Sequence, residues 1–319
     1  MKAIVQDGAA CAQLKEIDKP AVADGEVLVR VRAAAVNALD WHTLNGGRLV
    51  RAIAFLLRVP WSPVRGVDLA GRVESVGRNV TRFHAGDEVF GYALGAFAEY
   101  ASAKEDMLAP RPLELTFEEA AAIPIAGVTA LQGLRDKAHL QPGQSVLVYG
   151  AGGGVGTFAV QVAKALGARV TAATSARNFE QVRACGPDEL VDFVEEDITR
   201  RAQRYDVVFD VAATRPLGDL CRILAPRGTL VLAGAAKGNI LVQLSRLTQA
   251  LALSLFGRQR IVTYIAKVAQ KDLVALKDFA ETGKLKPVID RRYPLAEAID
   301  AIRYLGTGQA RAKVVIDVG

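Results

Sequence analysis

The chain has 319 residues, a length that suggests two domains and allows a substantial core without disulfides or metals. Hydrophobic residues make up 51% and charged residues 23%, and this balance excludes an intrinsically disordered chain. Cysteine and histidine are scarce, with no C-x-x-C and no H-x-x-x-H spacing, so the sequence predicts neither a disulfide framework nor a zinc site rich in cysteine or histidine. The three cysteines and three histidines are Cys11, Cys185, Cys221, His42, His84 and His139. None of the cysteines stands in a catalytic sequence context, so we expect all three to be structural.

The net charge of +6 and the isoelectric point near 9.3 do not come from one long basic run. Aromatic residues, which stack on bases, make up only 6%, so we expect no nucleic-acid partner. The first residues contain no apolar core followed by a cleavage site, and we expect a cytoplasmic protein. The longest apolar stretch, residues 240–256, is shorter than the about 20 residues of a membrane span and contains Arg246. It predicts an amphipathic helix in the fold or at a subunit contact, with membrane association as the alternative.

The first third of the chain has the pattern of short β-strands. Val27, Val29 and Val31 recur with the period of a half-buried strand. Residues 71–77 and 86–91 are two further strand candidates bounded by glycines. Short strands at this close spacing predict a small barrel or sandwich.

From Thr116 onward, helices and strands alternate. Thr116 and Glu119 have the spacing of a capping box, which predicts the start of a helix. Successive strand–helix–strand units then predict a parallel sheet with right-handed crossovers. A helix over residues 271–282 leads to a final pair of strands near 288–291 and 313–318, so we expect the chain to return to the first domain. The expected strands of the parallel sheet are residues 145–149, 169–174, 190–193, 206–211 and 229–233.

A strand, a glycine-rich turn and a helix follow one another over residues 146–165, and this segment carries the strongest functional signal. Gly150, Gly153 and Gly156 form G-x-x-G-x-x-G, because residue 155 is Val and breaks the usual G-x-G-x-x-G. Glycines let backbone amides approach a pyrophosphate, and the helix N-terminus attracts its negative charge. In this context the turn predicts a dinucleotide site, with a glycine turn that binds nothing as the alternative.

The end of the second strand indicates which nicotinamide cofactor binds. An NAD site usually has Asp or Glu there, but no acid lies between Thr157 and Phe179. The strand is followed instead by Ser175 and Arg177, whose hydroxyl and guanidinium suit a 2′-phosphate. We predict NADPH; the alternative is that Ser175 caps the next helix and Arg177 is solvated.

Taken in order, these segments resemble the medium-chain dehydrogenase/reductase superfamily, and most of all its zinc-free, zeta-crystallin-like quinone oxidoreductase branch. The resemblance covers nearly the whole chain and implies an α/β fold, with a GroES-like β-rich catalytic domain and a Rossmann domain built on a doubly wound parallel sheet. The implied domains are residues 1–122 with 288–319, and residues 123–287, with the active site in the cleft between them. The segments that carry the resemblance are residues 36–40, 66–77, 86–91, 95–100 and 121–130, the glycine turn, and residues 310–316.

Zinc-dependent relatives carry a cysteine in the segment that here begins with Asn37, and a histidine where this chain has Val67. Neither residue can replace a thiolate or imidazole ligand, so the resemblance implies no metal site and no zinc Lewis acid. The chemistry that it implies is hydride delivery from NADPH to an acceptor that needs little activation. Quinones and α,β-unsaturated carbonyls (enones), which are small and hydrophobic, are such acceptors.

The resemblance also implies cofactor contacts, residue by residue. Phe193 stands where many quinone reductases have a tyrosine near the 2′-phosphate, and it can pack but cannot form a hydrogen bond. The implied contacts are Thr129 at the nicotinamide; Gly152, Gly153, Gly154 and Val155 at the pyrophosphate; Ser175, Arg177 and Phe193 at the 2′-phosphate end; Gly234 and Ala235 beside the nicotinamide; and Arg311 in the returning C-terminal segment.

Three residues are candidates for the reaction itself. Asn37 is a candidate amide donor to the nicotinamide or a substrate oxygen, or else a turn residue at a strand end. Asp40 and Tyr92 are candidate proton-relay groups, although a helix cap or ion pair is the favoured interpretation of Asp40 and packing an equal one for Tyr92. Water is an alternative proton donor. His42 is expected to be a partly buried structural residue rather than a general acid, and residues 48–58 either a lid or a packed helix.

Together these observations predict an NADPH-dependent quinone or enone oxidoreductase. The family resemblance adds the expectation of a homodimer formed through the edge of the Rossmann sheet. Two alternatives remain open at this stage. One is an NADPH-sensing interaction protein with little turnover, and the other is an NADP-dependent enzyme of the alcohol dehydrogenase type.

Overall fold

A computed structural model of the chain describes all residues except 7–11, 46–61, 235–247, 251–252 and 254–258. The chain divides into two compact units. The first comprises Met1–Ala126, Val268–Glu281 and Ile289–Gly319, and the second comprises Gly127–Lys267 and Thr282–Val288. Among the described residues, no helix is long and apolar enough to cross a membrane.

Helix α9 (Gln270–Glu281) belongs to the first unit, whereas the sequence prediction puts residues 271–282 in the second domain. The reason is packing, because α9 lies against strand β7 (Leu108–Pro110) of the first unit. Its buried residues Leu273 and Leu276 are spaced as one helical face. The sequence shows this face but not the surface that it covers.

The first unit is built on a seven-stranded sheet with the order β14-β15-β3-β4-β5-β7, and β6 pairs with β3. Val27, Val29 and Val31 of β3 are buried as predicted, and they join the core of this unit. Two short strands, β1 (Lys2–Val5) and β2 (Gln13–Glu16), form a separate pair. The other strands are β3 (Glu26–Val36), β4 (Asp68–Val76), β5 (Glu88–Tyr92), β6 (Tyr100–Lys104), β14 (Ile289–Pro294) and β15 (Lys313–Asp317).

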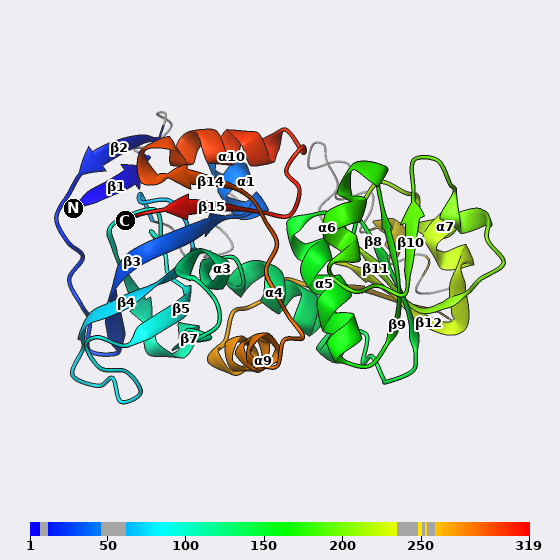
Figure 1. The fold of residues 1–319 in the computed structure, drawn as a ribbon, viewed down its shortest axis with the longest axis horizontal. Coiled ribbons are helices and arrows are strands. Elements are labelled where there is room, and N and C mark those ends of the chain that lie inside the picture. Colours follow the sequence, from blue (N-terminus) through cyan, green and yellow to red (C-terminus); the bar gives the residue numbers. More distant parts are fainter. Residues whose placement is uncertain (7–11, 46–61, 235–247, 251–252, 254–258) are drawn as a thin grey trace. The chain divides into compact units, whose positions relative to one another are not determined.

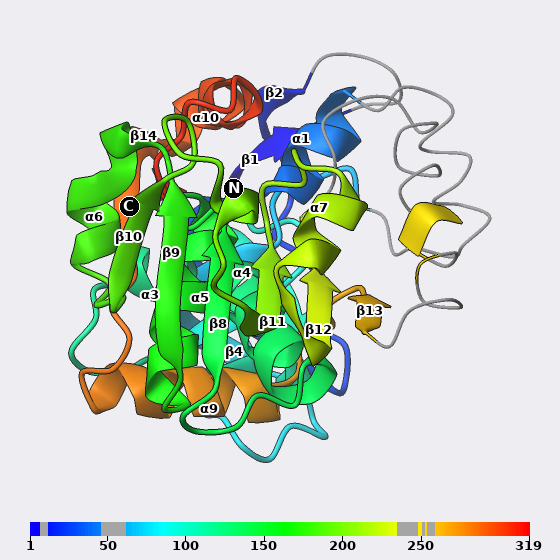
Figure 2. The same ribbon diagram turned by 90° about the vertical axis from the view of Figure 1, so that its right-hand side faces the viewer.

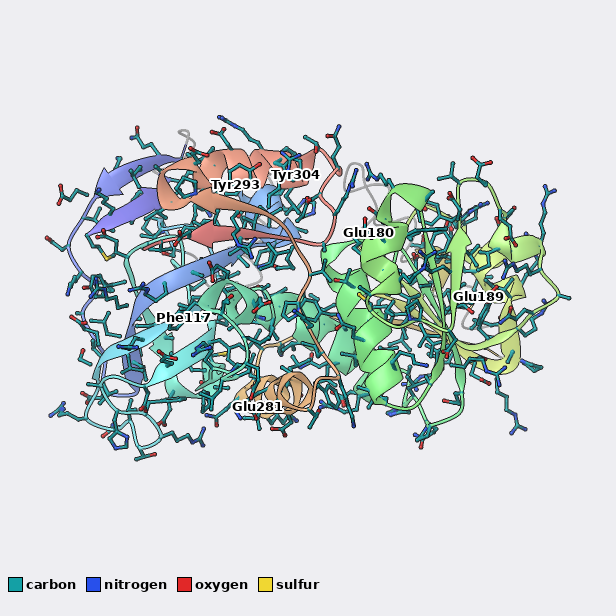
Figure 3. The ribbon with its side chains drawn as sticks, viewed as in Figure 1. Phe117, Glu180, Glu189, Glu281, Tyr293 and Tyr304 are labelled. Carbon is teal, nitrogen blue, oxygen red and sulfur yellow. The ribbon has the colours of Figure 1, made fainter. Side chains whose placement is uncertain are left out.

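Helix α10 (Ala298–Gly306) covers β14 and β15 (Figure 1). It also packs on α1 (Ala38–Asn45), where a Cβ at Gly306 would overlap the ring of Trp41. Tyr304 of α10 lies beside Tyr293 of β14, with ring centroids 6.4 Å apart (Figure 3). These contacts fix the C-terminal segment Ile289–Gly319 within the first unit.

Helix α3 (Phe117–Ala121) begins at the predicted capping box. The Thr116 side chain accepts from the Glu119 N–H, and the Glu119 carboxylate accepts from the Thr116 N–H. After the predicted break, α4 (Pro124–Leu131) starts at Pro124, a residue favoured in the first turn of a helix. It continues as a π-helix over Gln132–Lys137.

The second unit contains a six-stranded parallel sheet with the order β10-β9-β8-β11-β12-β13, shown in Figure 2. This is the 3-2-1-4-5-6 order of a doubly wound Rossmann sheet. Helices α5 (Gly154–Ala165) and α7 (Leu217–Arg222) cover opposite faces, and α6 (Phe179–Arg183) follows β9. The strands are β8 (Ser145–Tyr149), β9 (Arg169–Thr174), β10 (Glu189–Asp192), β11 (Tyr205–Asp210), β12 (Leu224–Leu232) and β13 (Arg260–Thr263).

The predicted α/β architecture is confirmed, and β8 and β9 have the predicted bounds. Among the elements that the sequence prediction missed are β13 and α10. β13 has only four residues, too few for a reliable period-2 pattern. The amphipathic spacing of α10 is present in the sequence, since Ala298, Ala301 and Ile302 are its buried residues. Most of the apolar stretch at 240–256 lies outside the described residues.

Candidate active site

A cluster of polar side chains is buried in the first unit, where strands β3, β4 and β15 meet α1. Asn37 follows β3, Asp40 lies in α1, and Asp68 and Lys313 are the first residues of β4 and β15. The sheet register brings them together, since Asp68 lies opposite Ala35 and the neighbour of Lys313 lies opposite Val36. We call Asn37, Asp40, Asp68 and Lys313 the buried polar cluster; the most exposed of them, Asn37, retains only 7% of its surface.

Hydrogen bonds fix the side chain of Asn37 within this cluster. Its Oδ1 accepts from Lys313 Nζ at 2.7 Å, and its Nδ2 donates to Asp68 Oδ2 at 2.9 Å and to the Ala35 carbonyl at 3.3 Å. The reverse amide orientation would place Nδ2 against the ammonium and Oδ1 against the carboxylate. The surroundings of Asn37 therefore select one orientation of its amide.

This arrangement corrects the donor role predicted for Asn37. Both hydrogens of the Asn37 amide are used inside the protein, by Asp68 and Ala35, so neither is available to a nicotinamide or a substrate oxygen. The sequence prediction considered a strand-end turn residue as the alternative, and the position of Asn37 between β3 and α1 agrees with it.

The Asp40 carboxylate accepts from the Asn37 backbone N–H at 2.8 Å, across the start of α1. This is the helix-capping interaction that the sequence analysis favoured for Asp40. Burial raises the pKa of Asp40 to about 7, and the charge of Asp68 acts in the same direction. The Asn37 N–H, Lys313 and Arg65 oppose this rise. Asp40 consequently changes its protonation state near neutral pH.

Asp68 and Lys313 form a fully buried ion pair, with Lys313 Nζ 3.6 Å from Asp68 Oδ2. Burial raises the pKa of Asp68 and lowers the pKa of Lys313, because each loses hydration of its charged form. Each group opposes the shift of the other, and the Ile125 backbone N–H, 3.2 Å from Asp68 Oδ1, also favours the carboxylate. The Lys313 ammonium donates in addition to the Val36 carbonyl at 3.2 Å.

Tyr92 lies at the end of β5, opposite Asp68 of β4. Burial raises the pKa of Tyr92, and the charges of Asp68 and Asp40 raise it further, so the hydroxyl stays protonated at neutral pH. Within the described part of the chain, this hydroxyl makes no hydrogen bond. Tyr92 therefore differs from Asn37 in holding a donor that no described residue uses.

Sequence reasoning missed Asp68, Lys313 and Arg65 as members of this neighbourhood. A signal for Lys313 exists, because it opens a strand of buried apolar residues, and lysine is rarely buried without a partner. The partner is not predictable from spacing, since Asp68 comes from a distant part of the chain. Ala312, just before Lys313, is buried with a φ of 80°, a left-handed conformation that costs energy for any residue but glycine.

The glycine turn of the second unit joins β8 to α5. Gly150 has a φ of 97°, and a Cβ there would lie 2.7 Å from the Ala212 nitrogen. A Cβ at Gly156 would overlap the Gly150 carbonyl, and one at Gly152 would overlap the Asn178 side chain. These glycines are required by the fold of the turn itself.

Gly153 is different, because no atom of the described residues crowds it. The nearest atom to a Cβ at this position would be the Gly150 carbonyl oxygen, at 3.8 Å. Gly153 is the N-cap of α5, and the first N–H groups of a helix have no acceptor within that helix. The space at Gly153 fits a pyrophosphate held by the N–H groups at the start of α5.

The segment after β9 carries the residues expected at a 2′-phosphate. Ser175 is half-buried and Arg177 is exposed. The Asn178 amide donates to Ser175 Oγ at 3.3 Å, and the Ala176 N–H donates to Asp192 Oδ2 at 3.1 Å. Asp192, at the end of β10, is an acidic neighbour that sequence reasoning missed.

The remaining predicted cofactor residues are Phe193, Thr129, Gly234, Arg311 and Ala235, and they belong to different elements of the chain. Phe193 packs on the Tyr149 ring, with centroids 5.3 Å apart, as expected of a residue that cannot form a hydrogen bond. The Thr129 carbonyl accepts from the Tyr264 hydroxyl at 2.5 Å, and a Cβ at Gly234 would overlap the Val211 carbonyl. Arg311 belongs to the first unit and is exposed. Ala235 lies outside the described residues.

Three further predictions concern His42, residues 48–58 and the cysteines. His42 is exposed on α1, so the prediction that it is partly buried is wrong. Residues 48–58 lie outside the described part of the chain. Burial raises the pKa of the Cys185 thiol to about 12 and also raises that of half-buried Cys221, which agrees with their predicted structural role.

Known proteins resemble this chain over its whole length. The family model of the alcohol dehydrogenase GroES-like domain matches residues 23–113, and that of the zinc-binding dehydrogenase matches residues 185–316. A chloroplastic quinone-oxidoreductase, QR1, from Triphysaria versicolor is 32% identical, covering 99% of this chain and 98% of that protein. A chloroplastic NADPH-dependent alkenal/one oxidoreductase from Arabidopsis thaliana is 32% identical over 93% of this chain and 73% of that protein.

A solved structure of the quinone oxidoreductase from Coxiella burnetii superposes with a TM-score of 0.86 at 28% identity, covering 100% of this chain and 99% of that one. The GroES-like sheet, the Rossmann sheet and these likenesses define an oxidoreductase of the medium-chain dehydrogenase/reductase superfamily. Within that superfamily, the chain belongs to the quinone oxidoreductase-like family.

Proposed function

We propose that this protein is an NADPH-dependent oxidoreductase that reduces quinones or enones. The observation that carries the proposal is the uncrowded glycine Gly153 at the N-cap of α5, in a sheet with Rossmann strand order. The names of two relatives, a quinone-oxidoreductase and an NADPH-dependent alkenal/one oxidoreductase, support this choice of substrates and cofactor.

Most of the proposed cofactor contacts belong to the second unit. Gly152, Gly153, Gly154 and Val155 hold the pyrophosphate, and Thr129, Gly234 and Ala235 are the proposed contacts of the nicotinamide. Ser175 and Arg177 bind the 2′-phosphate, with Arg177 supplying the charge. Asp192 supports this end from the protein side, because its two carboxylate oxygens accept the Ala176 and Val194 N–H groups. Phe193 and Arg311 are further proposed cofactor contacts.

When bound, NADPH supplies the hydride. We propose that residues of the first unit stabilise the negative charge that develops on the substrate and supply its proton. A quinone or enone that accepts hydride develops negative charge on oxygen. The Tyr92 hydroxyl is a protonated donor with no partner among the described residues, so it can bind that oxygen. Asp40, whose pKa is about 7, is suited to exchange a proton with it at neutral pH.

We further propose that the reaction is independent of zinc. The donor set supports this, because Asn37 and Val67 stand where zinc-dependent relatives have ligands. Over the described ranges, no three His, Cys, Asp or Glu side chains gather as a metal site would need. The Lys313 ammonium beside Asp68 also disfavours a second cation at this position.

The direct test mixes purified protein with NADPH and a panel of quinones and enones, and follows the consumption of NADPH. We expect turnover with at least one class, by protein that contains no stoichiometric zinc. Turnover that requires one zinc per chain would favour the alcohol dehydrogenase alternative. Tight NADPH binding with no turnover across the panel would favour a cofactor-sensing protein.

The predicted cytoplasmic location and homodimer belong to the proposal as well. An edge strand such as β13 is the expected dimer contact, since no strand of the described residues pairs with its outer side. Analytical ultracentrifugation of the purified protein measures its oligomeric state directly. A monomeric mass at working concentrations would contradict the homodimer.

A further inference from the structure

Lys313 brings a cation into the interior of the first unit. Its side chain retains 3% of its surface, and Asp68 retains none. The ammonium contacts Asn37 Oδ1 at 2.7 Å and the Val36 carbonyl at 3.2 Å, with Asp68 Oδ2 at 3.6 Å. All three surrounding groups are oxygens, so the site is shaped for an ammonium.

The contacts of Lys313 extend to the candidate catalytic groups through Asn37 and Asp68. Lys313 fixes Asn37 Oδ1, and this directs Asn37 Nδ2 to Asp68. The Asn37 backbone N–H holds the Asp40 carboxylate, and Asp68 lies opposite Tyr92 in the sheet. Each proposed proton-relay group therefore neighbours a direct partner of Lys313: Asp40 neighbours Asn37, and Tyr92 neighbours Asp68.

Stability alone does not account for this lysine. A buried ion pair loses hydration on both sides, and well-packed apolar residues usually serve the fold as well or better. The chain also places Ala312 in a left-handed conformation immediately before Lys313. Costs of this kind, gathered at one place, are typical of functional sites.

We propose that Lys313 is a positioning residue of the active site, whose ammonium orients Asn37 and Asp68 and through them sets the places of Asp40 and Tyr92. The proposal rests on the proposed function for its effect on turnover. The ammonium does not touch the substrate in this role. It acts as a fixed internal cation that holds the relay groups at working geometry.

Lys313→Met and the double variant Lys313→Met/Asp68→Asn test the proposal. The single variant leaves the Asp68 carboxylate buried without its cation, so we expect a lower melting temperature. The double variant removes both charges, and we expect most of the loss in melting temperature to be recovered. We expect kcat to stay about 10- to 100-fold low in both variants, because Asn37 has lost the contact that orients it. The KM for NADPH is expected to stay within about twofold, since the glycine turn is unchanged.

Wild-type kcat in the double variant would overturn the proposal, because Lys313 would then be only a counter-ion of Asp68. Lys277→Met is the matched control. Lys277 also forms an ion pair with a carboxylate, Glu281 at 2.5 Å, but on α9, and its loss is expected to leave kcat unchanged.

A second measurement does not depend on turnover. In protein with ¹⁵N-labelled lysine and asparagine side chains, NMR reports the charge of Lys313 and the environment of the Asn37 amide. We expect a protonated, slowly exchanging Lys313 signal at neutral pH, and an Asn37 amide signal that shifts in Lys313→Met. A neutral Lys313, or an Asn37 signal that ignores the substitution, would overturn the positioning role. Wild-type protein that shows the expected signals but no turnover would refute the proposed function alone.

Discussion

The ionisation of Asp40 links the buried polar cluster to the stability of the first unit. Burial raises the pKa of this carboxyl from 3.8 to about 7, against the opposing effects of the Asn37 N–H, Lys313 and Arg65. Asparagine has nearly the same shape as aspartate, and its side-chain oxygen can accept the Asn37 N–H, but it does not ionise. Asp40→Asn should therefore change how the free energy of unfolding depends on pH.

The magnitude follows from the two pKa values. Between pH 3.8 and about 7, the unfolded chain releases the Asp40 proton while the folded chain keeps it, so a rise in pH favours unfolding. The difference of about 3 units, at about 1.4 kcal/mol per unit, is on the order of 4 kcal/mol. The stabilisation by protonated Asp40 is complete below pH 3.8 and is lost as the pH rises through about 7. The free energy of unfolding of Asp40→Asn lacks this dependence on pH. Relative to the wild type, Asp40→Asn should therefore gain on the order of 4 kcal/mol of stability as the pH rises from 3.8 to above about 7.

Urea denaturation at a series of pH values, from about pH 4 to about pH 8, measures this difference. Tryptophan fluorescence is a selective probe, because both tryptophans, at positions 41 and 61, lie in the sequence range of the first unit. Asp106→Asn, at an exposed aspartate, is the matched control and should follow the wild type. Parallel stability curves for the wild type and Asp40→Asn would refute the reasoning.

Four other predictions concern substitutions at single positions. Tyr92→Phe should lower kcat by about 10- to 100-fold with little change in melting temperature, because the hydroxyl has no partner among the described residues; an unchanged kcat would remove Tyr92 from the mechanism. Gly153→Ala should fold normally yet weaken NADPH in a fluorescence titration, whereas Gly156→Ala should lose about 1–3 kcal/mol of stability in urea, because its Cβ overlaps the turn; equal stability of the two variants would contradict this. Arg177→Ala should weaken NADPH by about 10-fold or more and NADH far less, as compared by KM for each cofactor, and equal effects would contradict 2′-phosphate binding. Ala312→Gly should raise the free energy of unfolding by about 0.5–1 kcal/mol, since glycine adopts the left-handed φ without strain, and a loss of stability would show that the alanine is not strained.

Much of the second unit could be predicted from the sequence because its signals are local. Strand β8 has a continuous apolar run from Val146 to Tyr149, and a glycine turn separates it from α5. The residues proposed at the pyrophosphate and the 2′-phosphate therefore follow β8 and β9, where their sequence context predicts them. Asp192 was not predictable, because its partner Ala176 lies on another strand–helix connection and only the pairing of β10 with β9 brings the two together.

The buried polar cluster shows the opposite case. Asn37 and Asp40 were predictable as candidates, since they stand close together between a strand and a helix. Their roles were not, because the groups that use up the hydrogen bonds of Asn37 are Asp68 and Lys313, which come from other strands. A sequence shows which side chains can donate, but only the packed sheet shows which donors are still available.

The path of the chain through its two units has a consequence for folding during synthesis. The second unit ends at Val288, before β14 and β15 are made, so the ribosome releases all of it before the first unit has all its strands. Until β15 arrives, β3 lacks one neighbour and Asp68 lacks its lysine. We therefore expect the unit that begins the chain to be the last to reach its native state, and its unfinished sheet to be the part that most needs protection from aggregation.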